Sequence, residues 1–172
     1  MSITFKADIS TINSYKIIRL PVSSSEYLPS RGMVMIKGTI NGIYFEVPLE
    51  PDGKGSHWFE VDDKLSSQIG ETIGKPLSLQ IEPLSEWTEP VIPDDIMNPI
   101  MKEGLLDQWN SLTIKARWEW LRWIRSTSNA STRQKRINVA ISKLQKGDRR
   151  PCCFNSSLCT ITEVSKSGVL LD

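Results

Sequence analysis

Three basic side chains stand close together in the stretch STRQKR and could bind an anion. Arg133, Lys135 and Arg136 follow Thr132, a residue type that often caps the start of a helix. The start of a helix presents unpaired backbone N–H groups, and nearby guanidinium groups donate charge-assisted hydrogen bonds to phosphate or carboxylate. We therefore expect these four residues, together with Arg125, to form a ligand-binding site for a small anion.

The same basic stretch has an alternative explanation, in which an internal carboxylate neutralises it. On a helical wheel of ~100° per residue, Arg133 falls about 20° from the apolar Leu144, so its side chain should be partly buried. A partly buried cation requires a partner. Glu119, or an acidic residue from the first half of the chain, is a candidate for that role, and the sequence leaves both explanations open.

The remaining reactive residues form no recognisable catalytic or metal-binding motif. His57 is the only histidine, and it stands in an expected strand without a second histidine or a nucleophile motif nearby. Cysteines occur only at Cys152, Cys153 and Cys159; adjacent cysteines converge poorly on one metal ion, and three cysteines are not a disulfide framework. The sequence therefore predicts no catalytic residue, metal or cofactor and does not indicate an enzyme, while the role of the cysteines stays open.

Charge is distributed unevenly along the chain. Residues 1–90 carry 8 Lys and Arg against 12 Asp and Glu, whereas residues 91–172 carry 13 against 8. Within residues 111–150 there are 11 basic side chains against only Glu119 and Asp148. Such a basic region can contact nucleic acid or another anion, or it can be a solvated helical face beside an acidic domain, and the sequence does not decide between these.

The acidic half is predicted to be β-structure. In MVMIKGTINGIYFEVPL, Asn41-Gly42 separates two alternating runs, which is the preferred sequence of a two-residue type I′ hairpin. This turn fixes the register, so that Ile36 faces Val47, Gly38 faces Phe45 and Lys37 faces Glu46. Further strands are expected at Ile3–Ile9, Tyr15–Leu20, His57–Val61 and Leu77–Ile81, with a short helix at Asp62–Ile69. Short strands joined by tight turns predict a small β-barrel over residues 1–85.

The basic half is predicted to be helical, over residues 93–148. Pro93-Asp94-Asp95 is a helix-start signal, and Pro99 should begin or kink a second piece. Thr113 is expected to cap a helix from Ile114 to about Thr127, and Thr132 one from Arg133 to Lys146 that ends at Gly147. The fold class that follows is α+β, a barrel followed by a helical domain, with residues 149–172 as a cysteine-containing tail.

Three of the six tryptophans lie in RWEWLRWIR, inside the first of these long helices. Their apolar neighbours extend the apolar surface over roughly 220° of the helix, which is too wide for a helix with one solvated side. We therefore expect Trp118, Leu121 and Ile124 to be buried, and not to form a base-stacking surface for nucleic acid.

Length and composition are those of a globular protein: 172 residues, 39% hydrophobic and 24% charged. The N-terminus lacks the pattern of an export signal, and no apolar run approaches the length that spans a membrane. We therefore expect a cytoplasmic protein with no membrane span.

Two stretches carry a family resemblance. LPSRGMVMIKGTINGIYFEVPLEPDGKGSHWFEV resembles a small bacterial β domain of unknown function that is often joined to a YdeI/OmpD-associated helical domain, linked to bacteriocin protection. The helical half resembles that partner through VIPDDI, WNSLTIKARWEWLRWIRS and TRQKRI, in that order. The resemblance spans about residues 3–154 and implies a bacterial protein linked to tolerance of bacteriocins or membrane-active peptides. It supplies no catalytic motif.

Two functions are compatible with these observations. The first is a non-enzymatic stress or antimicrobial-peptide tolerance protein that binds a small anionic or peptide ligand between barrel and helices. The second is a nucleic-acid-binding module that uses the basic half, whose affinity would fall steeply with added salt.

Overall fold

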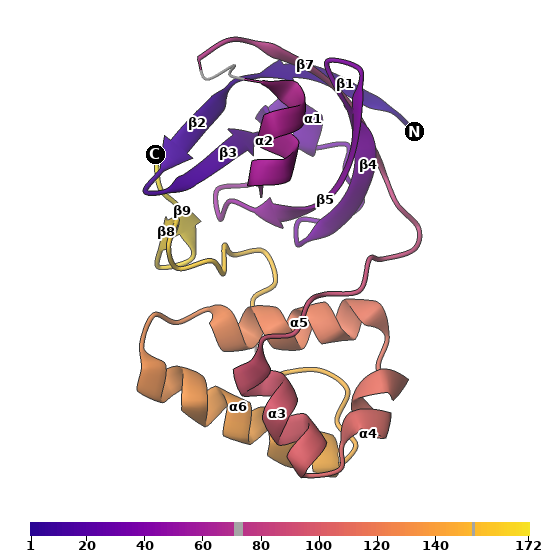
Figure 1. Cartoon of the computed structure of the whole chain (residues 1–172), viewed down its shortest axis with the longest axis vertical. Coiled ribbons are helices and arrows are strands. Elements are labelled where there is room, and N and C mark those ends of the chain that lie inside the picture. Colours follow the sequence, from indigo (N-terminus) through magenta and orange to yellow (C-terminus); the bar gives the residue numbers. More distant parts are fainter. Residues whose placement is uncertain (71–73, 153) are drawn as a thin grey trace. The chain divides into compact units, whose positions relative to one another are not determined.

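A computed structural model describes residues 1–70, 74–152 and 154–172, and these form two compact units (Figure 1). The β unit comprises Met1–Glu86, Ser156–Cys159 and Glu163–Asp172, and the helical unit comprises Trp87–Asn155 and Thr160–Thr162. The predicted α+β class is confirmed. The tail, which the sequence left as a separate segment, is divided between the two units.

Seven antiparallel strands form the curled sheet of the β unit, in the order β1-β7-β4-β5-β6-β3-β2. Their bounds are β1 (Ile3–Ala7), β2 (Ile9–Ile12), β3 (Tyr15–Arg19), β4 (Val34–Ile40), β5 (Ile43–Pro51), β6 (His57–Glu60) and β7 (Leu77–Pro83). The small barrel expected from the sequence is confirmed only in part, because the sheet is curled but open. The strand expected at Ile3–Ile9 is interrupted at Asp8, so that β1 pairs with β7 and β2 pairs with β3, and the two edges of the sheet meet at this interruption.

The central hairpin has the predicted register. Ile36 faces Val47 and Gly38 faces Phe45, and the turn residues Asn41 and Gly42 have φ of 47° and 83°, as a type I′ turn requires. One expected contact is different. Lys37 faces both Glu46 on β5 and Glu82 on β7, and its ammonium pairs with Glu82 at 3.3 Å.

Gly38 marks a close approach between β4 and β7. A Cβ atom at this position would lie 2.1 Å from the carbonyl oxygen of Gln80 and 2.9 Å from the Cα of Ile81. Both neighbours are backbone atoms that cannot rotate away. Only glycine therefore allows the two strands to pass at this distance.

The core of the β unit lies on the inner face of the sheet, and two short helices complete the unit, α1 (Val22–Ser25) and α2 (Asp63–Ile69). The predicted start and end of α2 are confirmed: the Asp62 side chain accepts the N–H of Leu65 at 2.8 Å, and Gly70 ends the helix with φ of 76°. Leu65 and Ile69 pack into the core from α2.

The last ten residues form a strap on the β unit. A short hairpin of β8 (Ser165–Lys166) and β9 (Val169–Leu170) buries Val164 and Leu170. The backbone N–H of Leu170 donates to the carbonyl of Asp52 at 2.8 Å, and the amide of Asn13 donates to the carbonyl of Glu163 at 2.6 Å. The strap is thus an integral part of the β unit, held by hydrogen bonds and buried side chains.

Four helices form the helical unit: α3 (Asp94–Lys102), α4 (Leu106–Ser111), α5 (Ile114–Arg125) and α6 (Ala130–Gln145). Thr113 caps α5 as predicted, accepting the N–H of Ala116 at 3.1 Å. The prediction for α6 is wrong at its start, because Asn129 caps it and Thr132 already lies in its first turn. Pro99 lies inside α3 and does not begin a new helix.

Trp120 is the central tryptophan of the helical core. It has no exposed surface, and its indole N–H donates to the carbonyl of Arg149 at 3.1 Å. Leu121 and Ile124 are buried as predicted. The prediction for Trp118 is wrong: this ring packs at the edge of the core, only partly buried, because its N–H reaches the carbonyl of Thr88 at 2.7 Å. None of the helices in the described ranges is long and apolar enough to cross a membrane.

Candidate functional site

One member of the expected anion site on α6, Arg133, is paired within the helical unit. Arg133 forms a two-pronged pair with Asp95 of α3, with Nε to Oδ2 at 2.7 Å and Nη2 to Oδ1 at 3.0 Å. The hydrogen bond from Arg133 is the main reason that the pKa of the Asp95 carboxyl lies below its usual value. The structure therefore supplies an internal carboxylate for Arg133. That carboxylate is not the one we considered, because Glu119 lies near Arg150, at 3.7 Å.

The other members of the expected site face different partners. Arg136 donates to the carbonyl of Trp123 at 2.8 Å and to the hydroxyl of Ser126 at 2.7 Å, and thereby provides hydrogen-bond donors to acceptor groups at the end of α5. Arg125 donates to the hydroxyl of Thr160 at 2.9 Å, and Lys135 is exposed. Arg136 and Arg125 are thus each engaged with hydroxyl or carbonyl groups of the chain.

The start of α6 is also occupied. The side-chain carbonyl of Asn129 accepts the backbone N–H of Thr132 at 3.0 Å. Thr132 itself lies one turn into the helix and does not cap it. The signal for this arrangement is present in the sequence, because Asn is as good a capping residue as Thr and stands three residues earlier.

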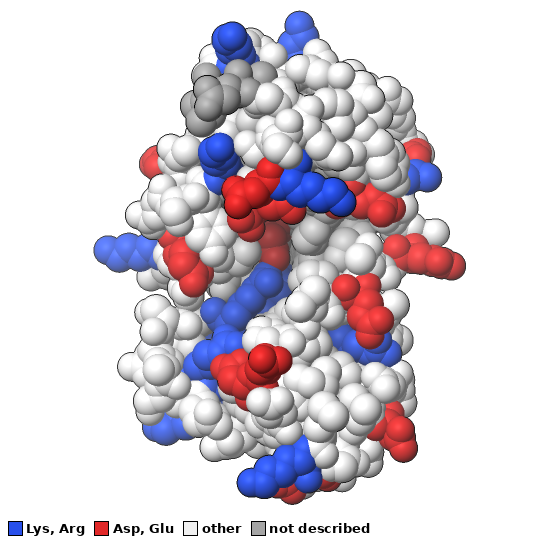
Figure 2. Space-filling model, in the orientation of Figure 1, with Lys and Arg blue, Asp and Glu red and all other residues white. Residues whose placement is uncertain are grey.

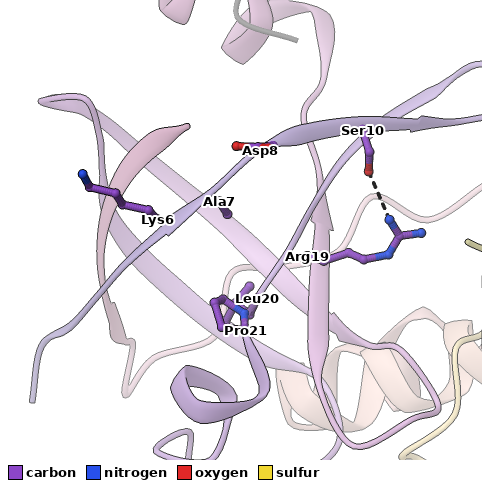
Figure 3. A pocket seen from close by; sticks show the side chains of 7 residues that line it. All are labelled: Lys6, Ala7, Asp8, Ser10, Arg19, Leu20 and Pro21. Carbon is purple, nitrogen blue, oxygen red and sulfur yellow. Dashed lines mark hydrogen bonds between the residues drawn. The ribbon is translucent and has the colours of Figure 1, made fainter. Parts of the chain in front are cut away.

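A cavity of about 470 Å³ lies in the β unit where the sheet is open (Figure 3). It is lined by Lys6, Ala7, Asp8, Ser10, Arg19, Leu20 and Pro21. These residues come from the end of β1, the start of β2, and the end of β3 with the two residues that follow it, and β1 and β2 are the two edge strands of the sheet. Backbone groups on the outer side of an edge strand have no strand partner and are available to a ligand.

Arg19 is one of three charged residues that line this cavity, with Lys6 and Asp8. Its guanidinium donates to the hydroxyl of Ser10 at 3.2 Å and to the carbonyl of Leu171 in the strap, and Figure 3 shows the side chain running toward Ser10. Among the described residues, no carboxylate pairs with Arg19, in contrast to Arg133. A guanidinium carries five N–H groups, so donors remain after these two contacts. The Lys6 ammonium points away from Arg19 in the same view and is exposed.

His57 belongs to a buried polar network that sequence analysis missed. Its Nε2 lies 2.7 Å from the carbonyl of Gly32, which can only accept, so Nε2 carries the proton. Its Nδ1 therefore accepts from the hydroxyl of Ser25 at 2.6 Å. Arg31 donates to the same hydroxyl at 3.2 Å. The partners lie 32 and 25 residues from His57, so no local sequence pattern could reveal them.

The Ser25–His57 pair has the atoms of a nucleophile and its base but not the access. Ser25 has 0% and His57 1% of its surface exposed, so no substrate reaches the serine oxygen. Burial lowers the pKa of His57, which keeps the imidazole neutral. The pair is a structural tie between α1, β6 and the 30–32 loop.

The tail cysteines lie in different surroundings. Cys152 is exposed and Cys159 is buried, whereas Cys153 lies outside the described residues. Within the described ranges, no three His, Cys, Asp or Glu side chains are grouped so that they could hold a metal ion.

Two family models match the chain, one for each unit. Residues 5–81 match a model described as a domain of unknown function (DUF1905), and residues 89–147 match one described as bacteriocin-protection, YdeI or OmpD-associated (OmdA). These matches confirm the resemblance stated from the sequence. A comparison with curated proteins finds no significant match.

Proposed function

Because the chain joins a DUF1905 domain to a bacteriocin-protection (OmdA) domain, we propose that it is a non-enzymatic binding protein that contributes to bacteriocin tolerance. The ligand is the carboxylate end of an extended peptide, and the binding site is the cavity at the open edge of the β unit. The observation that carries this proposal is Arg19, a partly buried guanidinium at a sheet edge whose partners are a hydroxyl and a carbonyl.

The geometry of the cavity favours a peptide over a bare anion. β1 and β2 are the two edge strands, and an extended peptide adds to such an edge by main-chain hydrogen bonds. A guanidinium beside the edge then offers charge-assisted hydrogen bonds to the terminal carboxylate. Leu20 and Pro21 provide the apolar part of the wall.

The direct test is an NMR titration of the protein with a short β-forming peptide that has a free C-terminal carboxylate, and with the same peptide as its C-terminal amide. We expect the carboxylate peptide to shift the backbone resonances of Ser10, Arg19 and Leu20. Loss of the charge-assisted bond should weaken binding of the amide about tenfold. Equal binding of the two peptides would refute the proposal.

Two matched variants each remove one positive charge from the β unit. Arg19→Gln removes it at the cavity, and Lys64→Gln removes it on the exposed face of α2. Arg19→Gln should weaken binding of the carboxylate peptide about tenfold, and Lys64→Gln should leave it unchanged. In a bacteriocin-sensitive bacterium that produces each protein, only Arg19→Gln should reduce survival. Survival equal to that with the unmodified protein would remove the link to tolerance.

The alternative, nucleic-acid binding by the basic half, loses support from the ion pairs of the helical unit. Arg117 pairs with Glu89 at 2.7 Å, and Arg133 pairs with Asp95. Figure 2 shows acidic and basic side chains together on the visible face of this unit. We therefore do not expect the protein to bind DNA or RNA with an affinity that falls steeply as salt is added. Such a steep loss of affinity with salt would restore the alternative.

A further inference from the structure

The outer face of the sheet carries two rows of polar side chains that the strand register brings into line. In the first row, Tyr44 faces Thr39, Thr39 faces Gln80 and Gln80 faces Thr4, across β5, β4, β7 and β1. These residues alternate with core residues along each strand, so their side chains point outward. None of them takes part in the peptide-binding cavity.

The second row lies beside the first and is charged. Glu46, Lys37 and Glu82 face one another across β5, β4 and β7. Ser2 lies beside the first row, where its hydroxyl accepts a hydrogen bond from the Gln80 amide at 2.8 Å. The result is a continuous polar surface across four strands.

A groove of about 390 Å³ runs over this surface, and Tyr44 stands at its border. The side chains that line the groove are Ser2, Lys37, Thr39, Tyr44, Gln80 and Glu82. The Tyr44 residue is 59% exposed, so much of its surface is accessible to a ligand in the groove.

The two charged residues that line the groove, Lys37 and Glu82, carry no net charge together. The Lys37 ammonium and the Glu82 carboxylate lie 3.3 Å apart and neutralise each other. A charged ligand therefore gains little net electrostatic attraction from this pair. The ligand that fits is neutral.

The hydrogen-bonding groups of the groove indicate which class of neutral ligand fits. Lys37 and the Gln80 amide donate, the Glu82 carboxylate accepts, and the Thr39 and Ser2 hydroxyls do both. A ligand that satisfies this mixture must itself carry many groups that both donate and accept, as the hydroxyls of a sugar do. The exposed ring of Tyr44 supplies an apolar face for the C–H side of a sugar ring.

We infer that this groove binds a neutral oligosaccharide, with one sugar ring on Tyr44 and its hydroxyls on Thr39, Gln80 and the Lys37–Glu82 pair. This site is separate from the proposed peptide cavity and does not depend on it.

The test is an NMR titration of the full chain with three neutral oligosaccharides, chitohexaose, cellohexaose and maltohexaose, at millimolar concentration. We expect at least one of them to shift the backbone resonances of Thr39, Tyr44 and Gln80 in a saturable way, and to leave those of Arg19 unchanged. Absence of saturable shifts with all three would overturn the inference. Shifts confined to residues outside the groove would also overturn it.

Tyr27 provides the matched control, because it is an exposed tyrosine of the same unit, 62% exposed, that lies outside the groove. Tyr44→Ala should weaken binding about tenfold, whereas Tyr27→Ala should not change it. Gln80→Ala should also weaken binding while the fold, followed by the dispersion of the NMR spectrum, stays intact. Equal effects of the two tyrosine variants would refute the site.

Discussion

Acidification should destabilise the β unit through His57. In the folded chain this imidazole is neutral: it is 1% exposed, burial lowers its pKa, and its Nδ1 is occupied as an acceptor by the Ser25 hydroxyl. In the unfolded chain it titrates near the ordinary histidine value of about 6.5. Below that pH, the unfolded chain therefore gains a proton that the folded chain does not.

The magnitude follows from this difference in proton binding. The free energy of unfolding should be independent of His57 titration above about pH 7 and should fall as the pH drops below about 6.5. At about pH 5 the loss is at most about 2 kcal/mol, a limit that is reached if His57 stays neutral in the folded state. The sign is that of a histidine with a lowered pKa, whose contribution is lost at low pH.

The assay is urea unfolding of the unmodified protein and of His57→Gln at several values between about pH 5 and 8, with the β-unit resonances as the signal. His57→Gln should be less stable throughout but should lack the loss between about pH 7 and 5. Glu60, whose pKa is raised by burial, has the opposite pH dependence, but it is present in both proteins and cancels in the comparison. Equal pH dependence of the two proteins would refute the reasoning.

Three further predictions concern contacts within each of the two units. A double-mutant cycle of Arg133→Ala and Asp95→Ala should give a coupling free energy of about 0.5–1 kcal/mol at neutral pH, because the pair is partly exposed. This coupling should vanish when acid protonates Asp95, and a coupling that persists in acid would contradict the prediction. Trp120→Ala should lower the free energy of unfolding by about 3–5 kcal/mol and Trp118→Ala by about 1–2 kcal/mol, in chemical denaturation; the reverse order would contradict the burial of the two rings. Gly38→Ala should cost about 3 kcal/mol in the same assay, at the upper end of the usual cost of overpacking, because the added atom meets backbone. A free energy of unfolding near that of the unmodified protein would contradict the close approach of β4 and β7.

Local signals explain which parts of the fold could be predicted. The register of the central hairpin follows from one dipeptide, because Asn41-Gly42 fixes the turn and the turn fixes every pair after it. The cap at Thr113 and the end of α2 at Gly70 likewise depend on a few neighbouring residues. The start of α6 was misplaced because we chose Thr132 as the cap, although Asn129 stands three positions earlier and is the stronger capping residue type.

Long-range partners explain what could not be predicted. Alternating strands indicate a curled sheet but do not say whether its two edges pair, so the open edge beside Arg19 had no signal in the sequence. Arg133 was expected to need a partner, yet the choice of Asp95 over Glu119 depends on how α3 packs against α6, across 38 residues of chain. The outward rows on the sheet became visible only when the partners of β7 and β1 were known.

The strap on the β unit has a consequence for the order in which the protein can mature. Residues 163–172 belong to the β unit, but the chain must first supply the whole helical unit before a ribosome reaches them. At about 5–20 residues per second, synthesis of residues 87–172 occupies roughly 4–17 s. During that interval the sheet lacks its contacts with the side chains of Val164 and Leu170. The loop at Gly53 also lacks its close contact with the backbone of Gly168. The helical unit can therefore fold to completion first, although it is encoded second.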